Sequence, residues 1–514
     1  MINKRLDVLF VNPDSSFEAY QELSRNYSAI ETPTWALLLA QSCRAKGFGV
    51  EILDCGAERL TLEESVERVS RANPRLVCLV MYGQNPNSGT TSMIGAELLG
   101  KKLKKEYPEY TVCFVGSHVS ALPKEVLALD CVDIVLLNEG VYALHNLLKT
   151  DLNQSLGLVR GIGYKKDGML ILNEPERVVP QNRMDIDLPG YAWDLLPYQK
   201  KPLDLYGSHF WHAGFDHDLR TPFAAIYTSL GCVFKCDFCM INIVNRIDNT
   251  DGIVAEDSPN MRFWSPKFIT GEFEKLASMG VETVRISDEM FFLNRRFFEP
   301  LLQGIISRGL QLRMWSYSRI DTVRPHYLDL FRQAGIGWLA LGIETGNQAV
   351  RQEVSKGSFK DVNIRSIVET TRQHDINVIS NYIFGLPDDS IATMQETLDL
   401  AMDLNTEEAN MYPCQALPGS SLYNLAKKST SSPLPVNYEG YAFLSYESQP
   451  MATKYCSAAE VISFRDEAWT RYHSSPKYLS LVESRFGLKQ RQNVESMAQI
   501  RLCRKILGDP PPER

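Results

Sequence analysis

Short apolar runs alternate with amphipathic stretches along the first 150 residues. The apolar runs are typical of buried strands, and apolar residues recur at helical spacing between them. The strand-like runs lie at residues 6–13, 50–58, 75–83, 111–116 and 133–140, and the helical stretches at 34–47, 61–71 and 90–106. This alternation predicts an α/β protein whose residues 1–150 form a doubly wound, Rossmann-like parallel sheet.

A second alternation follows a less regular segment. Periodicity is poor over residues 151–220, which we interpret as a connector with a hairpin around Lys166-Asp167-Gly168. Residues 221–425 contain six strand candidates separated by helical stretches, which predicts a partial (βα)6 TIM-like barrel. A small helical C-terminal unit is expected over residues 426–514.

Composition narrows the class of protein. Hydrophobic residues make up 44% and charged residues 23% of the chain, as in folded globular proteins. The formal net charge of -8 gives no general footprint for nucleic acid, so we expect no such partner. No apolar run approaches the roughly 18 residues of a membrane span, and the N-terminus lacks the features of a secretory signal. We therefore expect a cytoplasmic protein without a membrane span.

Three of the eleven cysteines stand in one loop. The segment TSLGCVFKCDFCMIN places Cys232, Cys236 and Cys239 in a CxxxCxxC pattern after the first barrel strand. Structural zinc takes four protein ligands, and no second cysteine pair occurs downstream. A disulfide is disfavoured in the cytoplasm. A 4Fe-4S cluster takes four ligands, so three cysteines leave one iron open for another molecule.

With this loop on a partial barrel, the chain resembles the radical S-adenosylmethionine superfamily. The resemblance implies a 4Fe-4S cluster on the three cysteines, with S-adenosylmethionine (SAM) chelating the open iron. It also implies that the reduced cluster cleaves SAM to a 5′-deoxyadenosyl radical, which abstracts hydrogen from an unactivated carbon. A small electron donor such as flavodoxin or ferredoxin is the partner that the resemblance implies.

The ends of the barrel strands carry residues at the positions where the family binds SAM. The resemblance implies that Phe238 packs near adenine and that the polar end of the second strand binds the methionyl amino group, for which an acceptor is suitable. The residues at the SAM-binding positions are Phe238, Ser287, Asp288, Glu289, Ser318, Arg319, Glu344 and Gly385. Each polar member alone is also explained as a helix cap or a surface ion pair, and their combination favours the functional interpretation.

The N-terminal sheet resembles the cobalamin (B12)-binding domain that precedes the barrel in the cobalamin-dependent members of the superfamily. Its strand ends read FVNP, LVMYG, VGSHVSALP and LLNEG. The resemblance implies that the loops at these ends cradle cobalamin, the alternative being that they only supply turn chemistry. The residues concerned are Asn12, Tyr82, Gly83, Gln84, Asn85, Gly116, Ser117, His118, Ser120, Asn138, Glu139 and Gly140.

The chain departs from the family pattern in several places. Family members often have a glycine pair before Pro-His, GEGE and SRGC, where this chain has Gly116-Ser117-His118, NEGV and SLGC. No DxHxxG motif is present, so the histidine that ligates cobalt in many other cobalamin proteins has no evident counterpart. The resemblance implies that the lower cobalt face is left to the protein wall or to water.

The function that the resemblance implies is C-methylation of a small-molecule substrate at an unactivated carbon, through the adenosyl radical and methylcobalamin. Three alternatives stay open: cobalamin-assisted cyclisation or rearrangement without net methylation, a tRNA methylthiotransferase, and a non-enzymatic cobalamin-binding module. The acidic pI and the scattered N-terminal cysteines argue against the tRNA enzyme. We expect the catalytic face to be lined by the connector from His209 to Asp218 and by Trp469, Tyr472 and His473.

Overall fold

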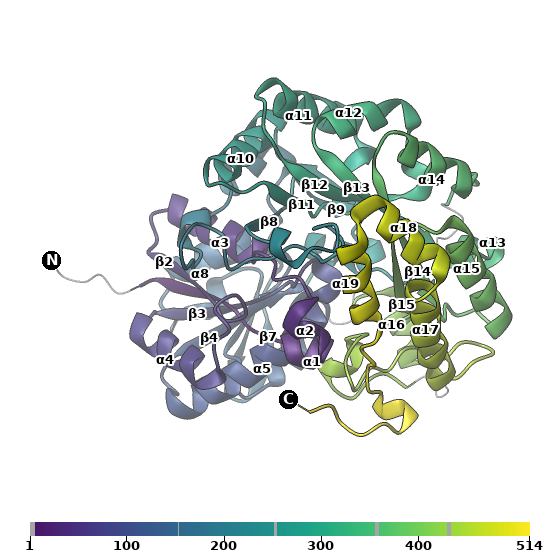
Figure 1. Ribbon diagram of the computed structural model, residues 1–514. Helices are drawn as coiled ribbons and strands as arrows, with labels where there is room; N and C mark the ends of the chain where they lie inside the picture. Colours follow the sequence, from purple (N-terminus) through teal and green to yellow (C-terminus); the bar gives the residue numbers. More distant parts are fainter. Residues whose placement is uncertain (1–5, 153, 251–253, 355–358, 429–432, 514) are drawn as a thin grey trace.

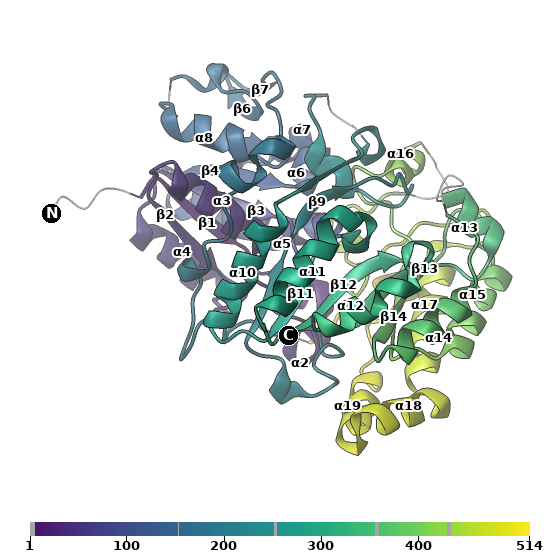
Figure 2. The same ribbon diagram turned by 90° about the horizontal axis from the view of Figure 1, so that it is seen from above.

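The computed structural model describes residues 6–152, 154–250, 254–354, 359–428 and 433–513. Two sheets dominate the molecule, a mostly parallel N-terminal sheet and a six-stranded parallel half-barrel (Figure 1). They lie beside each other, with the short strand β9 (Ser229–Cys232) between them in the view of Figure 2. The predicted α/β architecture is confirmed. In the described part of the chain, no helix has the length and apolar character needed to cross a bilayer.

The N-terminal sheet has the strand order β2-β1-β3-β4-β5-β6-β7, and β1 to β5 are parallel. Its parallel strands are β1 (Val8–Asn12), β2 (Val50–Asp54), β3 (Leu76–Met81), β4 (Thr111–Gly116) and β5 (Ile134–Leu136). The principal helices are α3 (Thr34–Ala45), α4 (Leu62–Ala72), α5 (Gly89–Glu106), α6 (Ser117–Ala121), α7 (Pro123–Ala128) and α8 (Val141–Lys149). In this order the first crossover runs from β1 to one side, to β2, and the next runs back to the other side of β1, to β3. Ligands of such sheets bind in the crevice at this switch point between β1 and β3.

The hairpin predicted in the connector belongs to this sheet. Strands β6 (Ile162–Lys166) and β7 (Met169–Leu172) pair with each other, and β6 adds antiparallel to β5. Asp167 and Gly168 form the turn with φ of 50° and 75°, the backbone that a tight two-residue hairpin requires. The connector thus begins as part of the first sheet.

The second sheet has the order β15-β14-β13-β12-β11-β8, with every neighbouring pair parallel. Its strands are β8 (Phe223–Ile226), β11 (Thr283–Ile286), β12 (Arg313–Arg319), β13 (Ile336–Glu344), β14 (Asn377–Phe384) and β15 (Glu408–Pro413). Helices α10 (Pro266–Ser278), α11 (Arg295–Ser307), α12 (Leu328–Gln333), α14 (Ile364–Gln373) and α15 (Ile391–Leu404) cover its outer side (Figure 1). The predicted six-stranded partial barrel is confirmed.

The first barrel strand is shorter than the apolar run FAAIYTSL indicates. The chain leaves the barrel after Ile226, and β9 pairs antiparallel with β10 (Asn260–Phe263). Hydrogen bonds draw the chain away from the barrel at this point. The backbone N–H of Thr228 and the hydroxyls of Thr228 and Ser229 donate to Asp288, just after β11. The turn also requires Gly231, whose φ is 87° and where a Cβ would lie 2.1 Å from the carbonyl oxygen of Asn260.

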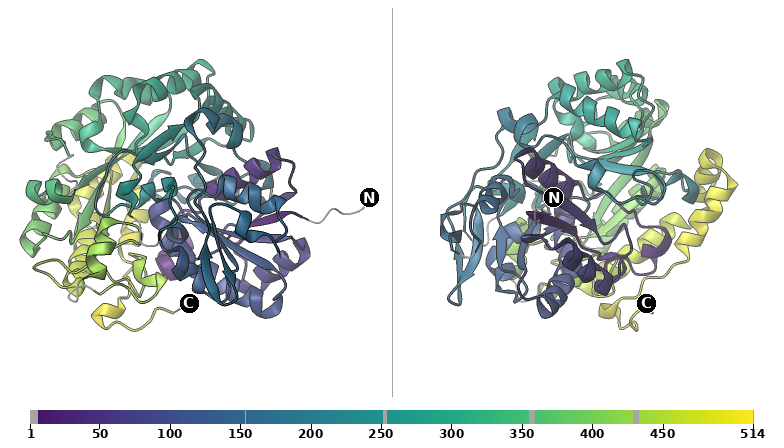
Figure 3. Two further views of the ribbon diagram at one scale, coloured as in Figure 1. Left: turned by 180° about the vertical axis from the view of Figure 1, so that it is seen from behind. Right: turned by 90° about the vertical axis from the view of Figure 1, so that its left-hand side faces the viewer.

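Three helices complete the chain, α17 (Ala458–His473), α18 (Pro476–Phe486) and α19 (Leu488–Ala498), and they run beside the barrel strands (Figure 3, right). His473 contacts Glu408, the first residue of β15, at 2.9 Å, and Tyr472 donates to the carbonyl of Thr406. These contacts lie at the amino ends of the barrel strands. The prediction that this unit lines the catalytic face at the carboxyl ends is therefore wrong for these two residues.

The last part of the connector, around Trp211 and His212, also lies at the amino ends of the barrel strands. The ring of Trp211 packs against Trp338 near the start of β13, with 5.3 Å between centroids, and His212 lies beside the backbone of Arg313. The prediction that this segment lines the catalytic face is likewise wrong for these residues. The reason is that a half-barrel has an open apolar bottom, and the aromatic side chains of the connector fill it.

A glycine in α5 tests the packing of the first sheet. A Cβ on Gly95 would lie 1.9 Å from the carbonyl oxygen of Asp14, which is backbone and cannot move aside cheaply. We expect Gly95→Ala to lower the free energy of unfolding by about 2 kcal/mol in chemical denaturation. The control is Gly271→Ala in α10, where a Cβ has nothing within 4 Å, and which we expect to raise stability by about 0.5–1 kcal/mol. Equal effects of the two substitutions would contradict this packing.

Candidate active site

The loops at the carboxyl ends of the two sheets contact each other. Glu139, just after β5, forms an ion pair of 2.8 Å with Arg262 of β10, and the two side chains are only 1% and 3% exposed. Arg262 also donates to Asn245 at 3.0 Å, and Arg246 donates to the carbonyl of Ser120. The segment that carries the three cysteines is therefore fixed to the ends of β4 and β5.

The cysteine loop lies between these two sheets. Cys232 ends β9 and its N–H donates to Asn242 at 2.9 Å, while the N–H of Cys239 donates to the carbonyl of Cys236 at 3.1 Å. Burial raises the pKa of Cys232 to about 11 and that of Cys236 to about 12, and it also raises the pKa of Cys239. A bound cation is what would keep three such thiols ionised.

The geometry of the thiols bears on what they can bind. Within the described ranges, no three His, Cys, Asp or Glu side chains converge on a point where one metal ion would sit. The three thiols are nevertheless close enough to raise one another's pKa. An iron-sulfur cube spreads its cysteine ligands over different irons, so this donor set fits a cluster.

A residue from the N-terminal sheet reaches the cysteine loop. Asn87, in the loop after β3, accepts the N–H of Met240 at 3.0 Å, and its Nδ2 lies 3.7 Å from the Sγ of Cys239. An amide N–H this close to a ligating sulfur stabilises its negative charge. The two units therefore share one polar contact at the sulfur itself, whereas the sequence predicted the loop from Tyr82 to Asn87 to contact cobalamin.

The three predicted residues at the end of β11 divide into two kinds. Both carboxylate oxygens of Asp288 accept hydrogen bonds from Thr228 and Ser229, so its role here is to stabilise the fold of the cysteine loop. Ser287 Oγ and Glu289 Oε1 are buried without a hydrogen-bond partner in the described structure. Burial raises the pKa of Glu289 to about 7, and Arg285 opposes that shift. These two orphaned polar atoms fit a ligand that carries a donor or a cation.

The next two strand ends bring charge toward the cysteines. Arg319, at the end of β12, forms a two-point ion pair with Asp321 and lies 3.7 Å above the ring of Phe234 in the cysteine loop. Glu344 ends β13 with a φ of 67°, an uncommon backbone for a residue with a side chain. Burial raises the pKa of Glu344 to about 7, although Arg319 and Arg351 oppose this. The hydroxyl groups of Ser318 and Thr322 are hydrogen-bonded to each other at 2.8 Å.

Phe238 and Gly385 lie on one side of the loop. Phe238 packs against an apolar cluster that includes Leu386 and Cys414. The N–H groups of Gly385 and Leu386 donate to Asp389, and a Cβ on Gly385 would lie 2.4 Å from Val461 of α17. Gly385 is thus required by packing, and its contact with SAM stays a prediction.

The residues predicted for cobalamin at the ends of β1 and β3 flank the switch point of the sheet. Asn12 donates to Asp54 at 2.9 Å, and Tyr82 donates to the carbonyl of Asn138 at 2.7 Å. Gly83 turns the chain with a φ of 59°, and Gln84 and Asn85 follow it half-buried. The loop 83–85 is therefore the part of this set that is open to a ligand.

The remaining residues predicted for cobalamin have partners within the protein. The hydroxyl of Ser117 donates to Pro86, that of Ser120 to Asn138, and the ring of His118 contacts Thr90 at 3.0 Å. His118 is 1% exposed. Glu139 pairs with Arg262, Asn138 and Gly140 form the turn at β5, and Gly116 packs on the carbonyl of Met81. These residues position the loops, and any direct contact with cobalamin stays a prediction.

Sequence reasoning missed a polar group inside the barrel. Glu31, on the segment between β1 and α3, pairs with Arg285 of β11 and contacts His209 at 2.9 Å. Burial raises the pKa of Glu31, but Arg285 and His209 outweigh it and hold the pKa below its ordinary value. The guanidinium of Arg285 lies over Trp315 and Tyr317 at 5.0 and 5.3 Å. The only local signal was a lone arginine in an apolar strand.

Trp35 of α3 was also missed, because it opens an apolar helix and resembles a core residue. Its ring stacks on Tyr82 at 4.3 Å, and its Nε1 is buried without a partner in the described structure. A small cavity there is lined by Trp35, Pro86, Gly231 and Glu289. Two buried polar atoms without a partner in the described structure, Trp35 Nε1 of the first unit and Glu289 Oε1 of the second, therefore belong to residues that line the same cavity between the switch point and the cysteine loop.

Comparison with known proteins gives two family matches. Residues 226–401 match the radical SAM superfamily, and residues 23–148 match the B12 binding domain. An uncharacterized methyltransferase of Pyrococcus horikoshii is 23% identical over 456 residues, which cover 87% of this chain and 89% of the relative. An anaerobic magnesium-protoporphyrin IX monomethyl ester cyclase of Rubrivivax gelatinosus is 24% identical over 434 residues, which cover 81% of this chain and 69% of the relative.

A solved structure shares the fold over most of both chains. It is the radical S-adenosylmethionine methyltransferase TsrM from Kitasatospora setae, with a tryptophan substrate and a SAM analog bound. The TM-score is 0.63 at 16% identity, and the match covers 93% of this chain and 89% of that chain. The predicted order of a cobalamin-type sheet before a radical SAM barrel is confirmed.

The ion pair between the two units can be tested alone. We expect Glu139→Gln to lower the free energy of unfolding by about 3 kcal/mol, because it leaves the buried Arg262 without a counter-charge. Glu67→Gln is the matched control, since its pair with Arg71 has side chains 60% and 69% exposed and should change stability by less than about 0.5 kcal/mol. Denaturant unfolding measures both, and similar losses would show that the buried pair does not hold the units together.

Proposed function

This chain belongs to the radical SAM superfamily and carries a B12-binding domain ahead of its radical SAM domain, and from this premise we propose that it is a cobalamin-dependent C-methyltransferase acting on an unactivated carbon of a small molecule. The observation that carries the proposal is the meeting of the two carboxyl-terminal edges, where Asn87 of the first unit touches Cys239 of the second. Two cofactors held at these edges would face each other across one small space.

The cysteine loop has the donor set for a 4Fe-4S cluster, with Cys232, Cys236 and Cys239 as its ligands. When bound, the cluster with SAM supplies radical chemistry and cobalamin supplies a methyl group, while the protein provides orientation and excludes water. The loop is held for this task by Asn242 at Cys232 and by Asn87 at Cys239.

The strand ends beside the loop supply contacts for SAM. Ser287 Oγ and Glu289 Oε1 are unpaired acceptors, suited to the methionyl ammonium group. Glu344 is half-buried and has no ion pair in the described structure, and its carboxyl group suits ribose hydroxyls. Arg319 is already paired with Asp321, so its own contribution is to hold Phe234 of the cysteine loop in place.

We place cobalamin at the switch point of the first sheet. The open main chain at Gly83, with Gln84 and Asn85, flanks that crevice, and Trp35 offers a buried N–H beside it. Glu139 and Asn138 have an indirect role. They contact Arg262 and Arg246 and so fix the β9–β10 hairpin opposite the crevice. His118 lies in the interior of the domain, so we propose that the protein wall covers the lower cobalt face.

Methylation is favoured over cyclisation by the relative that matches most of both chains and is described as a methyltransferase. The cyclase relative keeps ring formation as the second candidate. Isotope transfer separates them, because the methyl group of labelled SAM appears in a methylated product and does not appear in a cyclised one. We also propose a cytoplasmic location and a flavodoxin or ferredoxin as electron donor.

The enzyme class is tested by the cysteines. Anaerobically reconstituted protein with dithionite should contain iron and labile sulfide and form 5′-deoxyadenosine from SAM. Cys236→Ala should lose the labile sulfide and at least about 99% of 5′-deoxyadenosine formation, because a cluster held by two cysteines is not retained. Cys503→Ala, outside the loop and half-buried, should keep both properties. Formation of 5′-deoxyadenosine by Cys236→Ala would contradict the proposal.

The role of Glu289 is tested by SAM affinity. We expect Glu289→Gln to raise the half-saturating SAM concentration about tenfold, the equivalent of one charge-assisted hydrogen bond, with an unchanged iron content. Glu282→Gln is the control, since this carboxylate precedes the same strand, and its side chain is 67% exposed. If both variants bind SAM like the parent protein, Glu289 is not a SAM contact.

A further inference from the structure

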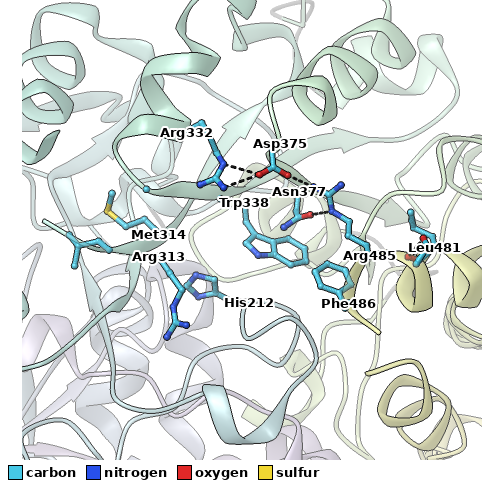
Figure 4. Close-up of a pocket in the computed structure, with 14 residues that line it drawn as sticks. His212, Arg313, Met314, Arg332, Trp338, Asp375, Asn377, Leu481, Arg485 and Phe486 are labelled. Carbon is cyan, nitrogen blue, oxygen red and sulfur yellow. Dashed lines mark hydrogen bonds and ion pairs between the residues drawn. The ribbon is translucent and has the colours of Figure 1, made fainter. Parts of the chain in front are cut away.

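A second cavity lies at the opposite end of the barrel from the cysteine loop. It occupies about 610 Å³ at the amino ends of β12, β13 and β14, and α18 closes one side (Figure 4). This volume is in the range of small-molecule sites. The chemistry described above uses none of its residues.

The charged side chains around the cavity are mainly positive. Arg313, Arg332 and Arg485 line it, against the single carboxylate of Asp375. Asp375 pairs with Arg332 at 2.8 Å and with Arg485 at 3.4 Å, which holds both guanidinium groups at the mouth (Figure 4). Arg485 also faces the buried Glu407 at 3.8 Å. Arg313 faces Glu282 at the longer distance of 3.6 Å, and its side chain is 56% exposed. An anion entering here would meet guanidinium groups that are already held in place.

The inner wall of the cavity is aromatic. Trp338 and Phe486 stand nearly parallel, with 5° between their planes and 5.8 Å between centroids (Figure 4). Trp211 from the connector supports Trp338 from behind. Such a wall offers a flat apolar surface next to the arginines.

A buried histidine lines the same cavity. His212 is 7% exposed, and neither ring nitrogen has a hydrogen-bond partner in the described structure. Burial, with smaller contributions from the charges of His209 and Arg313, lowers the pKa of His212 to about 3, so the ring is neutral and offers one donor and one acceptor. Buried polar atoms without partners are uncommon, and here they line a space large enough to hold the missing partner.

We propose that this cavity is a second ligand site, for a small organic anion whose carboxylate or phosphate binds the arginines and whose flat apolar body lies on Trp338. His212 supplies the hydrogen bond that fixes the ligand at its inner end. Because the cavity is at the amino ends of the strands, the ligand is separate from the reacting carbon, and the site does not depend on the function proposed above.

The test is isothermal titration of the reconstituted full-length protein with phenyl phosphate, inorganic phosphate and phenol. We expect phenyl phosphate to bind at a ratio of one, phosphate to bind more weakly, and phenol not to bind. Arg313→Ala should weaken phenyl phosphate about tenfold, the loss of one charge-assisted contact. Arg308→Ala, at the residue just after α11 and paired with Glu274, is the matched control and should leave the affinity unchanged.

Several outcomes would overturn the proposal: no binding of phenyl phosphate, equal binding of phenol, or an unchanged affinity in Arg313→Ala. His212→Phe keeps a ring in the same place, so an unchanged affinity there would overturn the role of His212, and a loss of affinity at an unchanged melting temperature would support it. Formation of 5′-deoxyadenosine should be the same in Arg313→Ala as in the parent protein, which separates this site from the reaction.

Discussion

The buried pair of Glu139 and Arg262 fixes how the two sheets face each other. Removing both charges from water is costly, and the pair survives because each member has further hydrogen bonds, Glu139 from the N–H of Val179 and Arg262 to Asn245. Arg262 lies in β10, the partner strand of Cys232 in β9. This electrostatic contact and its hydrogen bonds therefore help to set the position of the first cysteine relative to the N-terminal sheet.

The barrel has a polar end and an aromatic end, and the two serve different purposes. At the carboxyl ends, Ser287 Oγ and Glu289 Oε1 are buried without a hydrogen-bond partner in the described structure, at a cost in stability that a bound ligand would offset. At the amino ends, aromatic side chains of the connector and α18 close the open bottom of the half-barrel. Ser287 and Glu289 lie beside the cysteine loop, whereas the unpaired ring nitrogens of His212 lie at the amino ends of the strands.

Much of the fold could be predicted from the sequence because parallel strands covered on both faces are continuous apolar runs, as in Leu76–Met81. The cysteine loop was also accessible, since its three thiols are close in sequence. The β9–β10 hairpin was not, because the turn at Thr228 is set by Asp288, sixty residues later. Asn138 and Glu139 fit a ligand loop by position, but their partners Arg246 and Arg262 are distant in sequence and carry no local signal.

The chain leaves the first sheet after β1, crosses to the barrel, and returns as α3. On that excursion the hydroxyl of Thr32 accepts the N–H of Ala225 in β8, Ile30 bridges Gly207, and Glu31 enters the barrel to meet Arg285. The two halves are therefore interlaced rather than joined end to end. Separating the two halves would leave the buried Arg285 of one fragment without its counter-charge and expose the carboxylate of Glu31 in the other, so each half depends on the other for its own folded state.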